Sequence, residues 1–230
     1  MFTRTIQCLG PEAFARLQQA RVLLFGVGGV GGWCAEALVR TGVGHLTIVD
    51  FDTVALSNIN RQVVATAANV GQPKAEQMRQ RLLSLNPDAD ITARCERFDE
   101  NTAGSYCFSD FDAVVDAIDS VPSKVLLAHL VTEAGVPLFA SMGAARRLDP
   151  QQVRVASFSN VQGCALARAM RQQMKRVSLY PAHSFRCVFS AEQPAKSASP
   201  VLGSLAPVVG TFGMTLASLV IRRLISLVEP

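Results

Sequence analysis

The sequence predicts an α/β protein with a Rossmann-like, mostly parallel sheet that is covered by helices on both faces. Short, almost continuous apolar runs such as RVLLF and AVVDAI alternate with longer segments of helical periodicity, as in strands that are buried on both sides. The first of these runs leads directly into a glycine cluster, GVGGVGG. The chain has 230 residues, 49% of them apolar, which is enough for one domain with a well-buried core.

The elements of the first 140 residues follow this alternation. Proline is tolerated in the first turn of a helix, so Pro11 indicates a short helix over residues 11–20. Gly42 and Gly44 are typical of the end of the helix that follows the glycine cluster. The other expected elements are strands at 22–25, HLTIVD, ITARCE, AVVDAI and PLFAS, a helix that begins near Pro73, and a helix from about Pro122 to Ala134.

The residues after about 143 break this rhythm. They predict a strand (VRVAS), a basic helix (ALARAMRQQMKRV), a strand around RCVFS, a flexible segment (AEQPAKSASP) and an apolar C-terminal helix. Residues 201–221 carry no charge and are long enough to span a bilayer. Because they contain Pro207 and three glycines, we expect a loop followed by a helix buried in the core or at a subunit interface, and no membrane span.

Charge and cysteine content narrow the class of protein. The formal net charge of +4 permits an anionic partner such as a nucleic acid but does not require one. The six cysteines form no C-x-x-C pair, so we expect no zinc site. The first residues lack an apolar core followed by a cleavage site, so no secretory signal is expected. These features favour free thiols in a reducing cytoplasm.

The glycine cluster indicates a phosphate-binding turn. A strand, a glycine turn and a helix in succession place backbone N–H groups and the positive end of the helix against phosphate. Gly28 and Gly29 allow a ligand to approach without a Cβ in the way. Asp50, 24 residues after Gly26, ends the next strand, where a carboxylate binds ribose hydroxyls or caps a turn. The pattern also fits G-x-G-x-x-G, so a dinucleotide ligand remains an alternative here.

Two basic residues downstream favour a different nucleotide. Arg61 lies in a stretch with no other charge from Thr53 to Gln72. Lys74 is expected in the first turn of its helix, where a cation opposes the helix dipole at a cost of about 0.3–1 kcal/mol. A tolerated cost indicates a functional cation. Two cations beside a phosphate turn suit a triphosphate that is being cleaved, because charge builds up on the leaving group.

Two carboxylates, Asp116 and Asp119, close the strand segment AVVDAIDS. Asp116 or Asp119, at the carboxyl end of a strand and near the phosphates, could hold Mg²⁺. The alternative for Asp119 is to cap the helix that contains Pro122.

In their order and spacing, GVGGVGG, TIVDFDTVALSNINRQ, VGQPKAE, NP and DAIDS resemble the ThiF/MoeB superfamily of ATP-dependent adenylating enzymes, relatives of the ubiquitin-activating enzymes. The resemblance implies that ATP lies in the glycine turn and that Asp119 binds Mg²⁺. FTRTIQ resembles the N-terminal motif of the family, which implies that Arg4 is supplied to the ATP of the partner subunit in a homodimer. The implied nucleotide-binding residues are Gly26, Gly28, Gly29, Gly31, Asp50 (on the ribose), Asp52 and Asn58, and the implied catalytic residues are Arg61, Lys74 and Arg4.

The second half resembles one branch of this superfamily. GAARRLDPQQVRV, the basic helix, CVFSAE and TFGM…ASLVIRRLI are similar to the tRNA threonylcarbamoyladenosine dehydratases. The resemblance implies that a carboxylate on a modified adenosine beside the anticodon is adenylated and then closed to a cyclic ester, by the threonine hydroxyl or another nucleophile. Residues 1–140 would be the ATP-binding half of a single domain over 1–230, and 141–230 the part for substrate and dimer contacts.

Basic residues in the second half suggest where tRNA binds. Arg168, Arg171 and Lys175 fall on one helix face, and Arg146 and Arg147 lie on a loop after a strand. Together they form either a tRNA backbone footprint or a solvated face.

Three other functions remain open from the sequence. An activator of a ubiquitin-like sulfur carrier is disfavoured because the chain lacks the paired zinc cysteines and an obvious thioester loop. An NAD(P)-dependent oxidoreductase would leave Arg61 and Lys74 without roles. A non-catalytic nucleotide-binding protein is disfavoured because every implied ATP contact has a matching residue. Cys187 is a possible nucleophile, although a buried strand cysteine is the expected interpretation.

Overall fold

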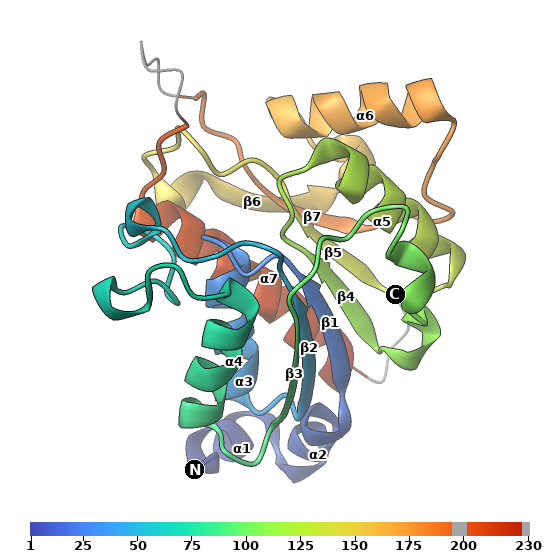
Figure 1. Ribbon diagram of the computed structural model, residues 1–230. Helices are drawn as coiled ribbons and strands as arrows, with labels where there is room; N and C mark the ends of the chain where they lie inside the picture. The colour runs from blue at the N-terminus through green and yellow to red at the C-terminus, as the bar shows by residue number, and fades with distance from the viewer. Residues whose placement is uncertain (195–201, 227–230) are drawn as a thin grey trace.

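The computed structural model describes residues 1–194 and 202–226, in which helices pack on both faces of a seven-stranded sheet (Figure 1). The strand order is β3-β2-β1-β4-β5-β7-β6. Neighbouring strands are parallel except for β6, which is antiparallel to β7. The predicted fold class is therefore confirmed. The strands are β1 (Arg21–Phe25), β2 (His45–Val49), β3 (Asp90–Arg94), β4 (Ala113–Asp116), β5 (Leu138–Ser141), β6 (Val153–Ser157) and β7 (Arg186–Ser190).

The helices divide between the two faces of the sheet. α3, α4 and α7 cover one face, and α5 and α6 cover the other (Figure 1). Each face has its own apolar cluster, with Leu38, Met78 and Leu216 in the first and Leu127 and Met170 in the second. The α-helices in the described part of the chain are α1 (Thr3–Leu9), α2 (Pro11–Gln19), α3 (Gly31–Thr41), α4 (Lys74–Leu85), α5 (Val121–Glu133), α6 (Ala165–Val177) and α7 (Ala206–Ile225).

The central strand β1 contributes to both clusters. Successive side chains of a strand point to opposite faces, so Val22 and Leu24 pack under α3 and α7 while Leu23 and Phe25 face α5. All four side chains are buried. A strand without a polar face has to lie in the interior of the sheet, which explains the continuous apolar run in the sequence.

α7 packs closely over the start of α3. A Cβ at Gly213 would lie 2.5 Å from the carbonyl oxygen of Val30 and 2.6 Å from the Cβ of Trp33, so glycine is required for this approach. One side of α7, with Phe212, is buried, whereas Met214 is exposed. By length and composition α7 could cross a membrane. In the fold, 39% of its most apolar 18-residue stretch is buried.

The structure also differs from the sequence expectations in several places. α1 is a helix that the sequence pattern did not predict. The polar stretch before α4 contains two short 3-10 helices, at Leu56–Asn58 and Ala67–Asn69. β2 ends at Val49, so Asp50 follows the strand instead of ending it. Most of the expected flexible segment AEQPAKSASP, from residue 195 on, lies outside the described residues.

The strand order places the candidate site. β1 has β2 on one side and β4 on the other, and the chain therefore changes direction across the sheet at β1. In open α/β sheets the loops that leave such a switch point diverge at the carboxyl ends of the strands and form a crevice.

Candidate functional site

A cavity of about 570 Å³ lies at the carboxyl ends of β1, β2, β4 and β5. We call one part the glycine-turn side, formed by the turn over residues 26–30, by 50–52 and by Lys74. We call another part the β5 side, formed by residues 141–147 and 164–166. The predicted site residues that line this cavity are Gly26, Gly28, Gly29, Asp50, Asp52, Arg61, Lys74 and Asp119.

Two glycines shape the turn itself. Gly26 has a φ of +86°, and a Cβ there would lie 2.7 Å from the carbonyl oxygen of Ala117. A Cβ at Gly31, the first residue of α3, would lie 1.7 Å from the carbonyl oxygen of Gly26. Gly31, which the family resemblance counted among the nucleotide contacts, does not line the cavity. In this geometry Gly31 allows helix and turn to pack closely.

The other two glycines face the cavity. A Cβ at Gly28 would meet only the side-chain Nε2 of Gln62, at 3.8 Å, and a Cβ at Gly29 would be in ordinary contact with Val209 at 3.5 Å. Side chains at these positions would therefore obstruct the cavity more than the protein. α3 begins without a side-chain cap. In its first turn the N–H of Gly32 already donates to the carbonyl of Gly28 at 3.1 Å, and the positive end of the helix still faces the cavity, where it favours an anion.

Asp50 fixes the turn and also lines the cavity. Its Oδ2 accepts a hydrogen bond from the backbone N–H of Val27 at 2.8 Å, and its Oδ1 accepts one from the N–H of Asp52 at 2.9 Å. Burial raises the pKa of Asp50, and these two hydrogen bonds and the charge of Lys74 partly oppose that rise. The remaining lone pairs of the carboxylate suit hydroxyl donors such as those of a ribose.

Lys74 is buried and forms an ion pair. Its Nζ lies 2.8 Å from Oδ2 of Asp52, and the Lys74 side chain is 6% exposed. The backbone N–H of Lys74 also donates to the carbonyl of Asp52, at 2.9 Å. The carboxylate therefore offsets the cost of a cation at the start of α4, which the sequence pattern alone did not reveal.

Arg61 has no acidic partner within the described part of the chain. Its Nη1 donates to the carbonyl of Ser57 and to Oδ1 of Asn60, both at 2.9 Å. The positive charge at the cavity wall is thus uncompensated by a carboxylate. Asn58 is buried and its Oδ1 accepts from the N–H of Ala55 at 3.0 Å. Asn58 holds the 3-10 turn before Arg61 and does not line the cavity.

Gln62 is a site residue that the sequence analysis missed. It lines the cavity and is 6% exposed, and its Oε1 has no hydrogen-bond partner among the described residues. Its position directly after Arg61 is the signal that could have pointed to it.

Asp116, the last residue of β4, and Asp119, in the loop that follows, have different environments. Asp116 is fully buried, its Oδ2 lies 2.9 Å from the Nζ of the fully buried Lys124, and its Oδ1 accepts from the N–H of Ile118. Burial raises the pKa of Asp116, against the opposing effect of Lys124. Of the two alternatives for Mg²⁺, Asp116 is therefore ruled out, because its carboxylate is buried and pairs with Lys124 and with the N–H of Ile118 in the loop after β4. The buried cation Lys124 was not anticipated from the sequence.

Asp119 faces the cavity. It is exposed and lines the cavity wall. The described residues give it no hydrogen bond or ion pair, and the start of α5 has no side-chain cap, so Asp119 does not cap that helix. No group of three or more His, Cys, Asp or Glu side chains in the described residues could hold a metal. A single carboxylate suits Mg²⁺ that is held mainly by nucleotide phosphates.

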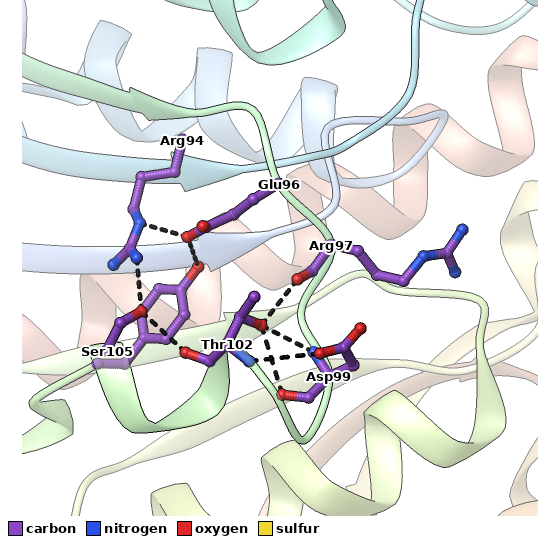
Figure 2. A network of polar contacts seen from close by, with 7 residues as sticks. Arg94, Glu96, Arg97, Asp99, Thr102 and Ser105 are labelled. Atoms are coloured by element: carbon purple, nitrogen blue, oxygen red, sulfur yellow. Dashed lines mark hydrogen bonds and ion pairs between the residues drawn. The ribbon is translucent and has the colours of Figure 1, made fainter.

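A stacked pair that the sequence analysis missed forms another part of the cavity wall. The guanidinium carbon of Arg97 lies 3.7 Å from the centre of the Phe51 ring, and both residues line the cavity. Figure 2 shows the Arg97 side chain pointing away from the polar network that holds its backbone. In that network Thr102 Oγ1 donates to the carbonyl of Arg97 at 2.8 Å, and Arg94 pairs with Glu96 at 2.6 Å.

The basic footprint is only partly available to a surface partner. Arg171 donates to the carbonyls of Phe158 and Val161 at 2.8 and 2.7 Å, which ties it to the fold. Arg147 is 3% exposed and lies in the cavity wall. The prediction that Arg147 belongs to a basic surface footprint for tRNA is therefore wrong. Arg168 and Lys175 are exposed on α6.

Two further candidates lie away from the cavity. Arg4 is exposed on α1, which lies with α2 near the amino end of β1 (Figure 1), and it does not line the cavity of its own chain. Cys187 is fully buried in β7, and burial raises its pKa to about 12. A thiol with that pKa is not a nucleophile at neutral pH, so the expectation of a buried strand cysteine is confirmed.

Comparisons with known proteins agree with this geometry. A tRNA threonylcarbamoyladenosine dehydratase of Bacillus subtilis is 34% identical over 84% of this chain and 75% of its own length. The dehydratase of Escherichia coli is 35% identical over 76% of this chain, which spans 65% of that enzyme's length.

Solved structures give the same match across nearly the whole chain. The crystal structure of the Escherichia coli dehydratase TcdA in complex with AMP has a TM-score of 0.91 and 32% identity, covering 97% of this chain and 93% of that one. The same enzyme in complex with ATP has a TM-score of 0.90. These matches favour the ATP interpretation of the glycine turn over the dinucleotide one. The model of the ThiF family matches residues 2–230, and the chain therefore belongs to the ThiF family.

Proposed function

We propose that this protein uses ATP to dehydrate threonylcarbamoyladenosine in tRNA, through adenylation of the threonylcarbamoyl carboxylate. The observation that supports this most is that one cavity joins the glycine turn to the β5 side. The glycine-turn side fits a nucleotide, and the β5 side leaves room for a second reactant next to it. Dehydratases of this kind are among the relatives and solved structures that this chain resembles.

The first step transfers an adenylyl group. An oxygen of the substrate carboxylate attacks the α-phosphorus of ATP, the bond from this phosphorus to the bridging oxygen of the β-phosphate breaks, and pyrophosphate leaves. Negative charge grows on the leaving group, so cations that already point at it lower the barrier. In this proposal Arg61 and Lys74 supply these cations, and Asp50 binds the ribose.

The second step closes a ring and releases AMP. A nucleophile within the threonylcarbamoyl group attacks the activated acyl carbon, and the bond from this carbon to the phosphate oxygen breaks. The former carboxylate oxygen leaves on AMP, so the nucleoside loses one molecule of water in total. The reaction is intramolecular at this point, which removes the need for a protein nucleophile such as Cys187.

Mg²⁺ fits the carboxylate that faces the cavity. Asp119 would hold it together with the phosphates. A divalent cation there neutralises charge on the phosphate oxygens.

Partner contacts complete the proposal. Arg168 and Lys175, which are exposed on α6, would contact tRNA phosphates. A homodimer would bring Arg4 of one subunit to the ATP of the other. The exposed side of α7, with Trp33, Pro207 and Met214 along a shallow groove, is the apolar surface that such a dimer would cover. The cytoplasmic location and the single-domain division at about residue 140 stay predictions.

The test is a direct assay of the product. The protein is incubated with ATP, Mg²⁺ and tRNA that carries threonylcarbamoyladenosine, and the digested nucleosides are analysed by mass spectrometry. We expect a loss of 18 Da, the mass of one water, with one AMP formed for each nucleoside converted. AMP formation that depends on a small carrier protein and ignores tRNA would contradict the proposal.

A further inference from the structure

Arg147 is a buried cation in the wall of the β5 side. It follows β5 on a loop that includes the small residues Gly143, Ala144 and Ala145. Only 3% of Arg147 is exposed, yet it is among the residues that line the cavity. Arg147 is therefore part of the cavity wall and is shielded from the outer surface.

The guanidinium has almost no partners in the fold. Its Nη2 donates one long hydrogen bond, 3.5 Å, to the carbonyl of Gly163. Nε and Nη1 are buried and have no hydrogen-bond partner among the described residues. No carboxylate of the described residues lies within ion-pair distance of it, in contrast to the buried Lys124, which has Asp116 at 2.9 Å. A buried charge left without a partner costs folding free energy. We therefore expect a ligand that binds in the cavity to supply the missing partner of Arg147.

A ligand that pairs with the Arg147 guanidinium has to be anionic and small enough to enter the cavity. A phosphate in the backbone of a nucleic acid on the outer surface cannot reach a side chain this buried. The nucleotide has cations of its own on the glycine-turn side, Lys74 and Arg61. A second anion next to the nucleotide is the carboxylate that has to be activated. Guanidinium groups bind carboxylates through short, charge-assisted hydrogen bonds.

We propose that Arg147 binds the carboxylate of the acyl substrate and holds it in the cavity for attack on ATP. This inference rests on the proposed function: Arg147 is the residue that selects a carboxylate as the substrate of the adenylation step. Arg147 then acts on the substrate alone, and ATP binding does not depend on it.

The stability of a variant separates this role from a structural one. Arg147→Met keeps the length of the side chain and removes an unpaired charge. We expect its Tm to equal or exceed that of the wild type, because apolar replacement of a buried charge is neutral or stabilising. Arg154→Met is the matched control: Arg154 is exposed on β6 and hydrogen-bonds only to backbone carbonyls of Gln151 and Val153. A clear fall in Tm for Arg147→Met alone would overturn the proposal, since it would show that the guanidinium supports the fold.

Binding of two small probes tests the carboxylate contact directly. The probes are the free nucleoside threonylcarbamoyladenosine and its methyl ester, titrated calorimetrically into protein saturated with AMP. We expect the wild type to bind the acid at least about tenfold more tightly than the ester, and Arg147→Met to bind both equally. Arg147→Lys, which retains the charge, should recover part of the preference. An acid-to-ester ratio that Arg147→Met leaves unchanged would overturn the proposal.

Kinetics distinguish this proposal from the proposed function. Arg147→Met should lower substrate-dependent AMP formation about 100-fold with the KM for ATP within about twofold of the wild type. Wild-type protein that forms no AMP with modified tRNA and binds neither probe would contradict the proposed function itself. Wild-type activity that Arg147→Met retains in full would contradict only the role of Arg147.

Discussion

On the glycine-turn side of the cavity the buried charged groups, Lys74 and Asp50, already have partners in the protein, whereas on the β5 side the buried cation Arg147 has almost none. Lys74 pairs with Asp52 at 2.8 Å, and Asp50 accepts two backbone hydrogen bonds. Arg147 has one long contact, at 3.5 Å, and two nitrogens without partners in the described residues. The difference indicates that the nucleotide meets a site held in shape by its own contacts, while the second reactant supplies a missing partner.

The largest effect is expected on the glycine-turn side. Lys74→Ala removes a preorganised cation and leaves Asp52 without its partner, so AMP formation should fall by about a factor of 1,000 or more. The measurement is AMP release with modified tRNA, alongside a thermal unfolding curve to show that the variant folds. Gln80→Ala, at an exposed position of the same helix, is the control that should keep full activity. Wild-type turnover by Lys74→Ala would remove Lys74 from the mechanism.

The second effect concerns the buried cation that does have a partner. Lys124→Met leaves the fully buried Asp116 uncompensated, and the free energy of unfolding should fall by about 3–5 kcal/mol. Chemical denaturation measures this. The exposed pair of Arg79 and Glu76, with N and O 3.2 Å apart, is the matched comparison, and Arg79→Met should cost less than about 1 kcal/mol. If Lys124→Met costs no more than Arg79→Met, the contrast between paired and open buried cations is wrong.

The same variant has a defined pH dependence. Burial already raises the pKa of Asp116 in the wild type, and loss of the Lys124 charge raises it further. In the variant the folded state then holds a proton that the unfolded chain releases, so stability increases as the pH falls through the folded pKa. The stability deficit of Lys124→Met should therefore shrink as the pH is lowered below neutral.

The smallest effect is expected at the thiols. Cys34, Cys164 and Cys187 are buried, whereas Cys8, Cys95 and Cys107 are exposed. Iodoacetamide at pH 8 should modify only the exposed three in the native protein and all six in denaturant, as peptide mass analysis would show. Cys187→Ser should keep AMP formation within about twofold of the wild type. Rapid native labelling of Cys187 that stops turnover would instead indicate that Cys187 is accessible and takes part in the reaction.

The sequence predicted the elements better than the contacts between them. Strands buried on both faces, such as β1, have no polar positions, and glycines mark turns. The alternation of strands and helices could therefore be predicted from the sequence. α1 was missed because its seven residues contain no buried position and therefore no periodic apolar stripe. The partner of Lys74 lies 22 residues away in the chain and becomes a neighbour only through the β2 and α4 crossover.

The site was predictable where backbone geometry dictates the residue. Gly26 belongs to the turn and Asp50 directly follows a strand, and both positions follow from local pattern. Arg147 looked like a surface charge because it follows a strand next to another arginine, and sequence alone gives no measure of burial. Phe51 and Arg97 come from the segments after two different strands, β2 and β3, and only the sheet brings them together.

The packing of α7 over the glycine turn also bears on how the protein is made. The glycine turn is synthesised before α7. Gly213 lies against Val30 and Trp33, and Arg16 donates to the carbonyl of Ile225 at 2.8 Å. The turn can therefore gain these neighbours only after α7 has been synthesised. We expect a chain that stops before α7 to lack these contacts and therefore the packing that holds the turn in place.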